Sequence, residues 1–201
     1  MSKNAYVGVW ENDVFIGVVV FGVGSGNATN GSRFGLPVTN AVAELTRVAL
    51  RSGHVTPVSR IVAIALRLLR TQSPGLRMLI SFADPAQGHY GGIYQAGGWV
   101  YAGVARTEVE YRVGAAWLHH RTANNTGSVR GLPSRKLPPK HRYLMPLDDE
   151  MRQRIAPLAR PYPKKPPCAT SIGSDAAPDR GAQGGATPTV ALHTNGIEQT
   201  P

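Results

Sequence analysis

The chain has few of the residues that mark several large protein classes. Its 201 residues include one cysteine, Cys168, which cannot form an internal disulfide or a cysteine-rich zinc site. Small disulfide-stabilised secreted domains are therefore excluded. The most apolar stretch, residues 14–23, is about half of the ~20 residues that span a bilayer, so it predicts a buried strand. No signal peptide and no membrane contact are expected, and the predicted location is the cytoplasm.

Acidic residues are also scarce. There are 12 Asp and Glu against 22 Lys and Arg, which gives a net charge of +10. Residues 1–143 hold 16 of the basic and six of the acidic side chains, so this part carries the whole surplus. A folded region with such an excess predicts an anionic partner, nucleic acid before an anionic membrane. A basic protein with no such partner is the alternative.

The first half of the chain predicts a strand hairpin and a strand–helix–strand unit. Residues 5–10 and 14–22 are apolar and β-branched, with a Glu-Asn-Asp turn between them. Residues 41–50 have strand-like composition, although a helix is also possible by propensity. Apolar side chains repeat at helical spacing over residues 58–71, and residues 76–83 resemble a buried strand.

Beyond residue 83 the pattern is less regular. Asp84-Pro85 predicts the start of a short helix that ends at Ala96, and residues 99–105 and 107–113 predict two strands. Residues 130–142 are basic and turn-rich. The predicted division is a catalytic domain over 1–147, a short helix or linker over 148–160, and a disordered Pro- and Gly-rich tail over 161–201.

These elements predict an α/β (α+β) fold. A strand–helix–strand unit of this length places strands 41–50 and 76–83 in parallel, whereas the hairpin before it is antiparallel. The sheet is therefore expected to be mixed and mostly antiparallel, with a central parallel strand pair flanked by helices.

Residues 93–103, IYQAGGWVYAG, resemble the closing motif of the GNAT acyltransferase superfamily. The resemblance implies a GNAT-like fold in which Tyr94 faces a split between the two parallel strands and handles protons at an acyl donor. It also implies acetyl-CoA or a related donor as cofactor. Residues 52–60, SGHVTPVSR, replace the glycine-rich CoA loop of that superfamily, and Ser59 and Arg60 at the helix start could still hold an anion.

A finer resemblance is to the phage Mom family of DNA adenine-modification proteins. It covers roughly residues 40–145 through the blocks ELTR (44–47), SR (59–60), SFAD (81–84), GHYGGIYQA (88–96) and KHRY (140–143). The resemblance implies an enzyme that acts on double-stranded phage DNA in the host cytoplasm. It converts adenine N6 to a methylcarbamoyl-type (acetamido) derivative, which protects the DNA from restriction.

The predicted catalytic residues are Ser81, Asp84, His89 and Tyr94. Asp84 follows a parallel strand, where ligands of α/β sheets commonly bind, although Asp-Pro is also an ordinary helix cap. His89 lies among glycines that would let a ligand approach closely, and it could accept a proton from an exocyclic amine. Tyr94 could instead only pack its helix on the sheet. His89 could alternatively hold a metal, but His54, His119 and His120 lack metal-ligand spacing with acidic neighbours, and no metal site is predicted.

Two further groups are assigned to ligand binding. Glu44 and Arg47 could be a base and an anion clamp at the cofactor, or an internal ion pair. Nucleic-acid contacts are predicted for a basic segment, comprising Arg130, Arg135, Lys136, Lys140 and Arg142. An enzyme acting on adenine N6 must extrude the base, and the aromatic residues that could stack on it, or simply form the core, are Tyr90, Tyr94, Trp99 and Tyr101.

Two other functions remain open at this point. One is a GNAT-type N-acetyltransferase acting on a small-molecule or protein amine. The other is a DNA-binding protein without enzymatic activity, in which the grouping of Ser81, Asp84, His89 and Tyr94 would be accidental.

Overall fold

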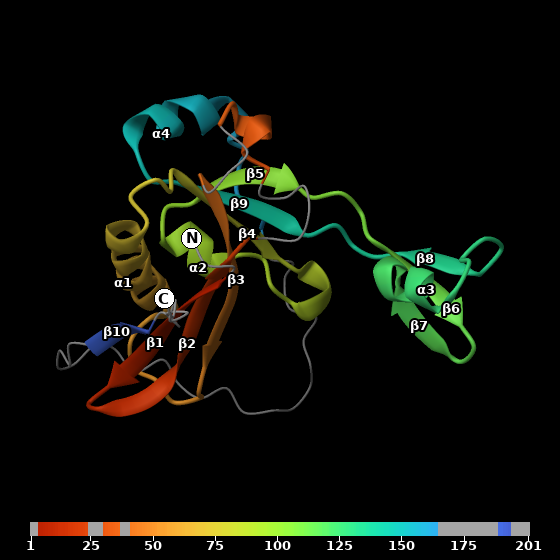
Figure 1. Ribbon diagram of the computed structural model, residues 1–201, viewed down its shortest axis with the longest axis horizontal. Helices are drawn as coiled ribbons and strands as arrows, with labels where there is room; N and C mark the ends of the chain where they lie inside the picture. Colours follow the sequence, from red (N-terminus) through yellow and green to blue (C-terminus); the bar gives the residue numbers. More distant parts are fainter. Residues whose placement is uncertain (1–3, 24–29, 37–40, 165–188, 194–201) are drawn as a thin grey trace, which may run out of the picture.

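The computed structural model describes residues 4–23, 30–36, 41–164 and, for the backbone, 189–193. They form a seven-stranded sheet in the order β10-β1-β2-β3-β4-β9-β5 and a three-stranded sheet in the order β7-β6-β8 (Figure 1). The strands of the large sheet, in chain order, are β1 (Asn4–Glu11), β2 (Val14–Gly22), β3 (Val42–Leu50), β4 (Met78–Ala83), β5 (Val100–Val104), β9 (His141–Pro146) and β10 (Thr189–His193).

The first two strands form the predicted hairpin. Its two-residue turn is Asn12-Asp13, and both residues have positive φ (48° and 64°), as the primed turns of tight hairpins require. The strand–helix–strand unit is also confirmed. Helix α1 (Val58–Gln72) connects β3 to β4, and these two strands pair in parallel, while the other pairs of the sheet are antiparallel. The fold class is therefore the mixed, mostly antiparallel one expected.

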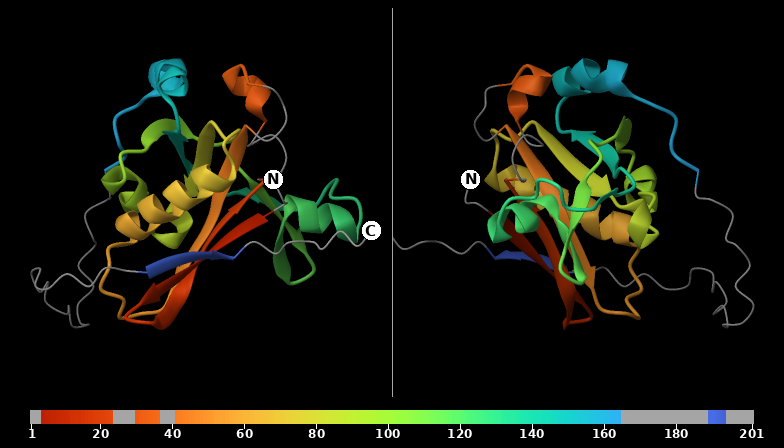
Figure 2. Two further views of the ribbon diagram at one scale, coloured as in Figure 1. Left: turned by 60° about the vertical axis from the view of Figure 1, so that its left-hand side comes forward. Right: turned by 90° about the vertical axis from the view of Figure 1, so that its right-hand side faces the viewer.

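Both faces of the large sheet are covered. One core lies between the sheet and α1, with Val7, Phe21 and Leu79 from the strands against Ile61 and Leu69 of the helix. In the other core, Met78 and Leu144 of the sheet pack with residues of two short elements, Phe34 of η2 (Gly31–Phe34) and Met151 and Ile155 of α4 (Asp149–Ile155). In all views η2 and α4 lie side by side (Figures 1 and 2), and Arg154 of α4 donates to the Phe34 and Gly35 carbonyls. The polar helix expected after residue 148 is thus part of the fold, followed by η4 (Ala156–Leu158).

A small lobe, residues 106–140, is inserted between β5 and β9 and projects from the main body (Figure 1). It contains β6 (Val109–Val113), β7 (Ala116–His119), α3 (His120–Thr126) and β8 (Ser134–Lys136). Of these, sequence reasoning predicts only β6. The basic segment 130–142, interpreted as turns, contains β8 and the start of β9, which lies between β4 and β5 in the sheet.

Two further expectations differ from the structure. The helix predicted from Pro85 to Ala96 is broken into η3 (Pro85–Gln87) and α2 (Gly92–Ala96), because Gly88 and Gly91 between them take positive φ values of 72° and 80°. Most of the tail predicted to be disordered lies outside the described residues. Residues 189–193 within it form β10, whose backbone pairs with Tyr6–Trp10 of β1, so the expectation fails for this stretch. Within the described ranges, no helix has both the length and the apolarity needed to cross a membrane.

Candidate active site at the splayed strand pair

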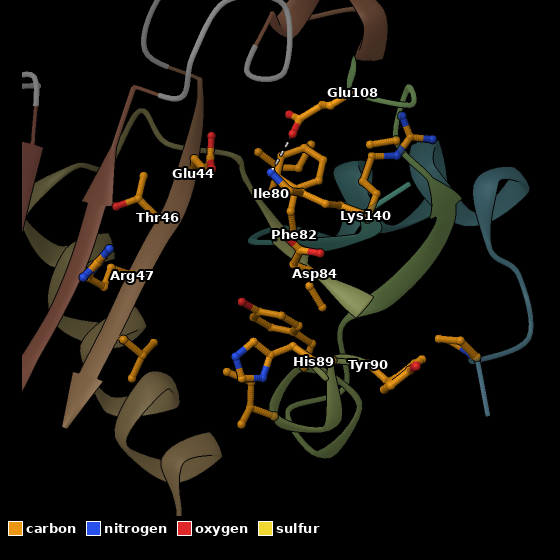
Figure 3. A pocket seen from close by; sticks show the side chains of 18 of the residues that line it. Glu44, Thr46, Arg47, Ile80, Phe82, Asp84, His89, Tyr90, Glu108 and Lys140 are labelled. Atoms are coloured by element: carbon orange, nitrogen blue, oxygen red, sulfur yellow. Dashed lines mark hydrogen bonds and ion pairs between the residues drawn. The ribbon is translucent and has the colours of Figure 1, made fainter. Parts of the chain in front are cut away.

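A cleft of about 1630 Å³ lies beside the parallel strand pair. It is bounded by β3, by the segment from Ala83 to Gln95 and by the inner side of the lobe. Figure 3 shows Glu44, Thr46 and Arg47 of β3 across the cleft from Asp84, Glu108 and Lys140. Small-molecule sites usually measure about 300–1,000 Å³, so this cleft has room for a nucleotide and a second reactant.

The cleft exists because β3 and β4 separate after three paired positions. The last paired residues are Glu44 and Ile80. At the next residue of β4, Ser81, the side chain and not the backbone makes the hydrogen bond to β3. Ser81 Oγ lies 2.8 Å from the Leu45 carbonyl oxygen and 2.7 Å from the hydroxyl of Tyr94 on α2. The carbonyl can only accept, so the single Ser81 proton goes to Leu45 and the Tyr94 hydroxyl donates to Ser81 Oγ. Ser81 and Tyr94 therefore close the gap between the separating strands.

The ring of Tyr94 is held by other aromatic rings. It lies 5.1 Å from the Trp99 ring and 5.0 Å from the Tyr143 ring, measured between centroids. The Tyr143 hydroxyl donates to the Tyr90 carbonyl at 2.6 Å, which ties the loop before α2 to β9. Gly91 allows this approach, since a Cβ at that position would overlap the Tyr143 ring. The hydroxyl of Tyr94 is thus positioned by packing on both sides.

Burial also sets the protonation of the site. The pKa of the Tyr94 phenol is raised, first by burial and further by the charge of Glu44. Burial likewise raises the pKa of Glu44, which the charge of Lys140 partly offsets. The phenol therefore stays protonated near neutral pH. The Glu44 carboxyl holds a proton more strongly than an exposed glutamate does.

A β-bulge brings Glu44 and Arg47 to the same cleft. Residues three apart on a regular strand point to opposite faces. Here the β2–β3 register shifts between the pairs Val20↔Arg47 and Phe21↔Leu45, which leaves Thr46 as the extra residue. Glu44, Thr46 and Arg47 consequently all line the cleft (Figure 3). No ion pair joins Glu44 to Arg47 in the described part of the chain, contrary to the internal pair considered from the sequence.

Comparison with known proteins identifies the protein family of this chain. The model of the Mom protein family matches residues 1–164, which include the cleft and the lobe. The chain belongs to the Mom family. The methylcarbamoylase mom of Escherichia phage Mu is 28% identical over 179 residues, and the match covers 81% of this chain and 73% of that protein.

In this Mom family chain, the cleft brings together three of the predicted catalytic residues. Asp84, His89 and Tyr94 all line it, and Ser81 lies behind Tyr94 with 1% of its surface exposed. Asp84 also caps η3, since its Oδ1 accepts the Ala86 N–H at 2.9 Å, so the cap considered from the sequence is present. His89 is exposed, and its backbone N–H donates to the Asp84 carbonyl at 3.0 Å. Among the described residues, no side-chain hydrogen bond joins these three to one another.

The predicted nucleic-acid residues are divided between two places. Arg130, Arg135 and Lys136 lie on the lobe outside the cleft. Arg135 is already engaged, because it pairs with Glu110 at 2.6 Å and its guanidinium stacks 4.6 Å from the Trp117 ring centroid. Lys140, by contrast, lines the cleft. It donates to Glu108 at 3.1 Å and helps, with His119 and His120, to lower the pKa of that carboxyl against the opposing effect of burial.

Arg142 lies in the cleft beside a second cation, Arg33 of η2, which sequence reasoning does not single out. The Nη2 of Arg142 donates to the Ala102 carbonyl at 2.7 Å, while the buried Nε of Arg142 has no partner among the described residues. Burial and the charge of Arg33 lower the pKa of Arg142. A half-buried guanidinium with a like charge nearby is stabilised by an anion, so this pair can hold a phosphate or a carboxylate.

The start of α1 does not fit the CoA pyrophosphate that the GNAT resemblance implies. Two backbone N–H groups just before the helix, those of Val55 and Thr56, already donate to the Glu11 carboxylate at 3.0 and 2.7 Å. A hydrogen bond from the Thr56 side chain, together with these two backbone bonds, lowers the pKa of Glu11, so the loop holds an internal anion. Neither Ser59 nor Arg60 lines the cleft, and Arg60 is exposed.

The aromatic candidates also separate by position. Tyr90 and Tyr94 line the cleft, whereas Trp99 and Tyr101 are buried in the core, as their alternative reading predicted. The Tyr101 hydroxyl lies 3.1 Å from His141 Nδ1. Tyr143 of β9 packs against Tyr94, a role that the sequence pattern does not predict although the residue ends the KHRY block. In the described residues, no group of three or more His, Cys, Asp or Glu side chains could hold a metal ion.

Proposed function

We propose that this Mom family chain modifies the exocyclic amine of adenine in DNA, converting N6 to a methylcarbamoyl-type derivative that protects the DNA from restriction. The observation that carries the proposal is the arrangement at the strand split. A buried phenol with a raised pKa, Tyr94, is held by Ser81, and Glu44 lies in the same cleft. Membership of the Mom family and similarity to a methylcarbamoylase support the same reaction class.

The two groups suit the two proton transfers of an acyl-type transfer to an amine. When N6 forms a bond to the donor carbon, it must lose a proton, and Glu44 is the carboxylate that can take it. When the leaving group departs from that carbon, it requires a proton, and Tyr94 is the acid that can supply it when its hydroxyl turns from Ser81 Oγ towards the cleft. A positioned group of this kind typically contributes ~10²–10⁴ in rate.

DNA is the substrate that the cleft and the charge of the chain favour. An adenine of duplex DNA can enter the cleft only if it leaves the base stack, and Tyr90 is an aromatic lining residue on which the extruded base could stack. Asp84 and His89 also line the cleft, and we assign them contacts with the edge of the base. The pair Arg33 and Arg142 can hold an anionic group of either reactant. The net charge of +10 favours association with a polyanion.

We further propose that the fold is GNAT-like. What supports this is a parallel strand pair that separates beyond its third position, followed by a helix that supplies a tyrosine to the split. The loop before α1, with Glu11 bound to its amides, departs from that pattern. The identity of the group donor is therefore open to a direct test with the purified protein.

The deciding experiment is mass spectrometry of nucleosides from DNA of bacteria that express the chain. The expected result is a new deoxyadenosine derivative of higher mass, together with resistance of that DNA to some restriction enzymes. Cells that express Tyr94→Phe at the same level provide the matched control. Unmodified nucleosides from cells with abundant folded protein would contradict the proposal.

A further inference from the structure

The inserted lobe, residues 106–140, has almost no core of its own. Within this fully described stretch only Ala123 is buried, although the lobe contains three strands and a helix. Its neck is held by two backbone hydrogen bonds, from Ala105 N to the Lys140 carbonyl at 2.8 Å and from Leu137 N to the Glu108 carbonyl at 2.9 Å. Elements with so little buried apolar surface gain order from a partner.

The charge of the lobe indicates what that partner is. The lobe contains seven Lys and Arg residues but only two acidic residues, Glu108 and Glu110. Both glutamates are already paired, Glu108 with Lys140 and Glu110 with Arg135. The other five cations form no ion pair with any described residue, and they are Arg106, Arg112, Arg121, Arg130 and Lys136. The lobe therefore has a net charge of +5 (seven basic minus two acidic residues), and five of its cations have no ion-pair partner within the described residues.

The five cations are not confined to one face. Arg112 of β6 is opposite Trp117 in the ladder, and Arg135 of β8 stacks on Trp117, so Arg112 and Arg135 lie on one face of the small sheet. Lys136 is the next residue after Arg135, so its side chain leaves the opposite face. Arg106 and Arg121 line the cleft instead. Cations on both faces of a narrow projecting element suit contact with two rows of phosphates, as in a groove of duplex DNA, better than docking on a flat acidic surface.

We propose that the lobe is the element that holds duplex DNA, contacting the phosphates beside the target nucleotide while the extruded base enters the cleft. The inference rests on the proposed function for its choice of DNA. The DNA contacts are thus assigned to the lobe as a whole and not to the linear segment 130–142. Arg106 and Arg121 line the cleft, and Arg112, Arg130 and Lys136 are exposed residues of the lobe outside it.

The test removes the three outer cations in one variant, Arg112→Ala with Arg130→Ala and Lys136→Ala. The control removes three equally exposed cations elsewhere, Arg51→Ala with Arg67→Ala and Arg70→Ala. Binding of a fluorescent duplex of about 25 base pairs is followed by anisotropy over a range of salt concentrations. We expect the lobe variant to bind at least tenfold more weakly. Its slope of log affinity against log salt should be shallower by about one to three, at about 0.9 per lost phosphate contact. The control should bind as the parent does.

A charge-preserving variant, Arg112→Lys with Arg130→Lys, keeps Lys136 and should bind the duplex nearly as well as the parent, which separates the loss of charge from other effects of substitution at these positions. Equal affinity and slope in the lobe variant and the parent would overturn the inference. Competition by polyglutamate as effective as that by unlabelled duplex would also overturn it, because the lobe would then be a general anion surface. If the parent binds DNA through the lobe but no modified nucleoside forms, the proposed function fails and the inference stands.

Discussion

The hydroxyl of Tyr94 lies 2.7 Å from Ser81 Oγ across the gap between two separating parallel strands. This contact joins a helix after β4 to the strand itself, and it holds the Tyr94 hydroxyl against a buried oxygen. Removal of either hydroxyl therefore changes the site without changing the rings and backbone that surround it.

Replacement of Tyr94 by phenylalanine should reduce modification about 10²–10⁴-fold, because the reaction loses a positioned acid. The ring remains to pack against Trp99 and Tyr143, so the thermal unfolding temperature should change little. Quantitative nucleoside mass spectrometry and calorimetry measure the two quantities. Ser81→Ala is the companion variant, which should retain the phenol but misplace it. Full modification by the Tyr94→Phe protein would return Tyr94 to a packing role.

Replacement of Glu44 by glutamine separates activity from stability. The pKa of Glu44 is raised in the folded state, so this carboxyl favours folding at low pH and opposes it once the pH rises through the folded pKa. At neutral pH, Glu44→Gln should therefore unfold at the same or a slightly higher temperature while losing modification. The parent's activity should fall as the pH drops through the raised Glu44 pKa. If Glu44→Gln modified DNA and its activity fell over the same acidic pH range as that of the parent, another group would be the base.

Gly91 and Gly88 form a matched pair for the loop before α2. Both have positive φ, but a Cβ at Gly91 would overlap the Tyr143 ring, whereas nothing lies within 4 Å of one at Gly88. Gly88→Ala should cost about 1–2 kcal/mol for the left-handed backbone alone. Gly91→Ala should cost clearly more and should also lower modification, because Tyr143 packs against Tyr94. Denaturant unfolding of both variants measures the difference, and equal losses would contradict the packing account.

Asp148 attaches α4 to the sheet and provides an acid-sensitive contact. It accepts two hydrogen bonds from Arg77, at 2.7 and 2.8 Å, and one from the Met151 N–H at 2.8 Å. The Arg77 hydrogen bond lowers the pKa of Asp148 from 3.8 to about 2. Its stabilisation is therefore present above pH 3.8 and is lost as the pH falls towards 2. Asp148→Ala should cost about 1 kcal/mol at neutral pH, since the side chain is partly exposed, and the difference from the parent should vanish near pH 2.

A chain ending at Lys164 tests the role of β10. The family match ends at this residue, and the cleft contains no described residue beyond Pro163. The shortened chain should fold and modify DNA, but it should unfold at a lower temperature, because β1 becomes an edge strand without the backbone pairs of β10. A chain ending at residue 194 retains β10 and is the control. Loss of modification by the shorter chain alone would make β10 part of the functional unit.

Local patterns predicted much of the fold. The hairpin follows from two β-branched runs around Asn12-Asp13, and α1 follows from apolar spacing over residues 58–71. The parallel pair follows from the length of the strand–helix–strand unit. The lobe strands β7 and β8 and the strand β9 were missed, since their short runs, such as SRK and HRYLMP, lack the alternation that marks longer strands.

What the sequence determined by itself is the set of chemical groups and their order: a glutamate on one strand, a serine and an aspartate at the end of the next, and a phenol on the short helix that follows, in a basic chain that resembles the Mom family. What only the tertiary structure decided is which of them meet. Ser81 reaches Tyr94 because the strands separate after three pairs, and Glu44 and Arg47 share a cleft because a bulge at Thr46 breaks the two-residue period. Arg33 joins Arg142 from a distant part of the chain. Strand separation, bulges and long-range packing depend on the whole sheet, so no local window of sequence contains them.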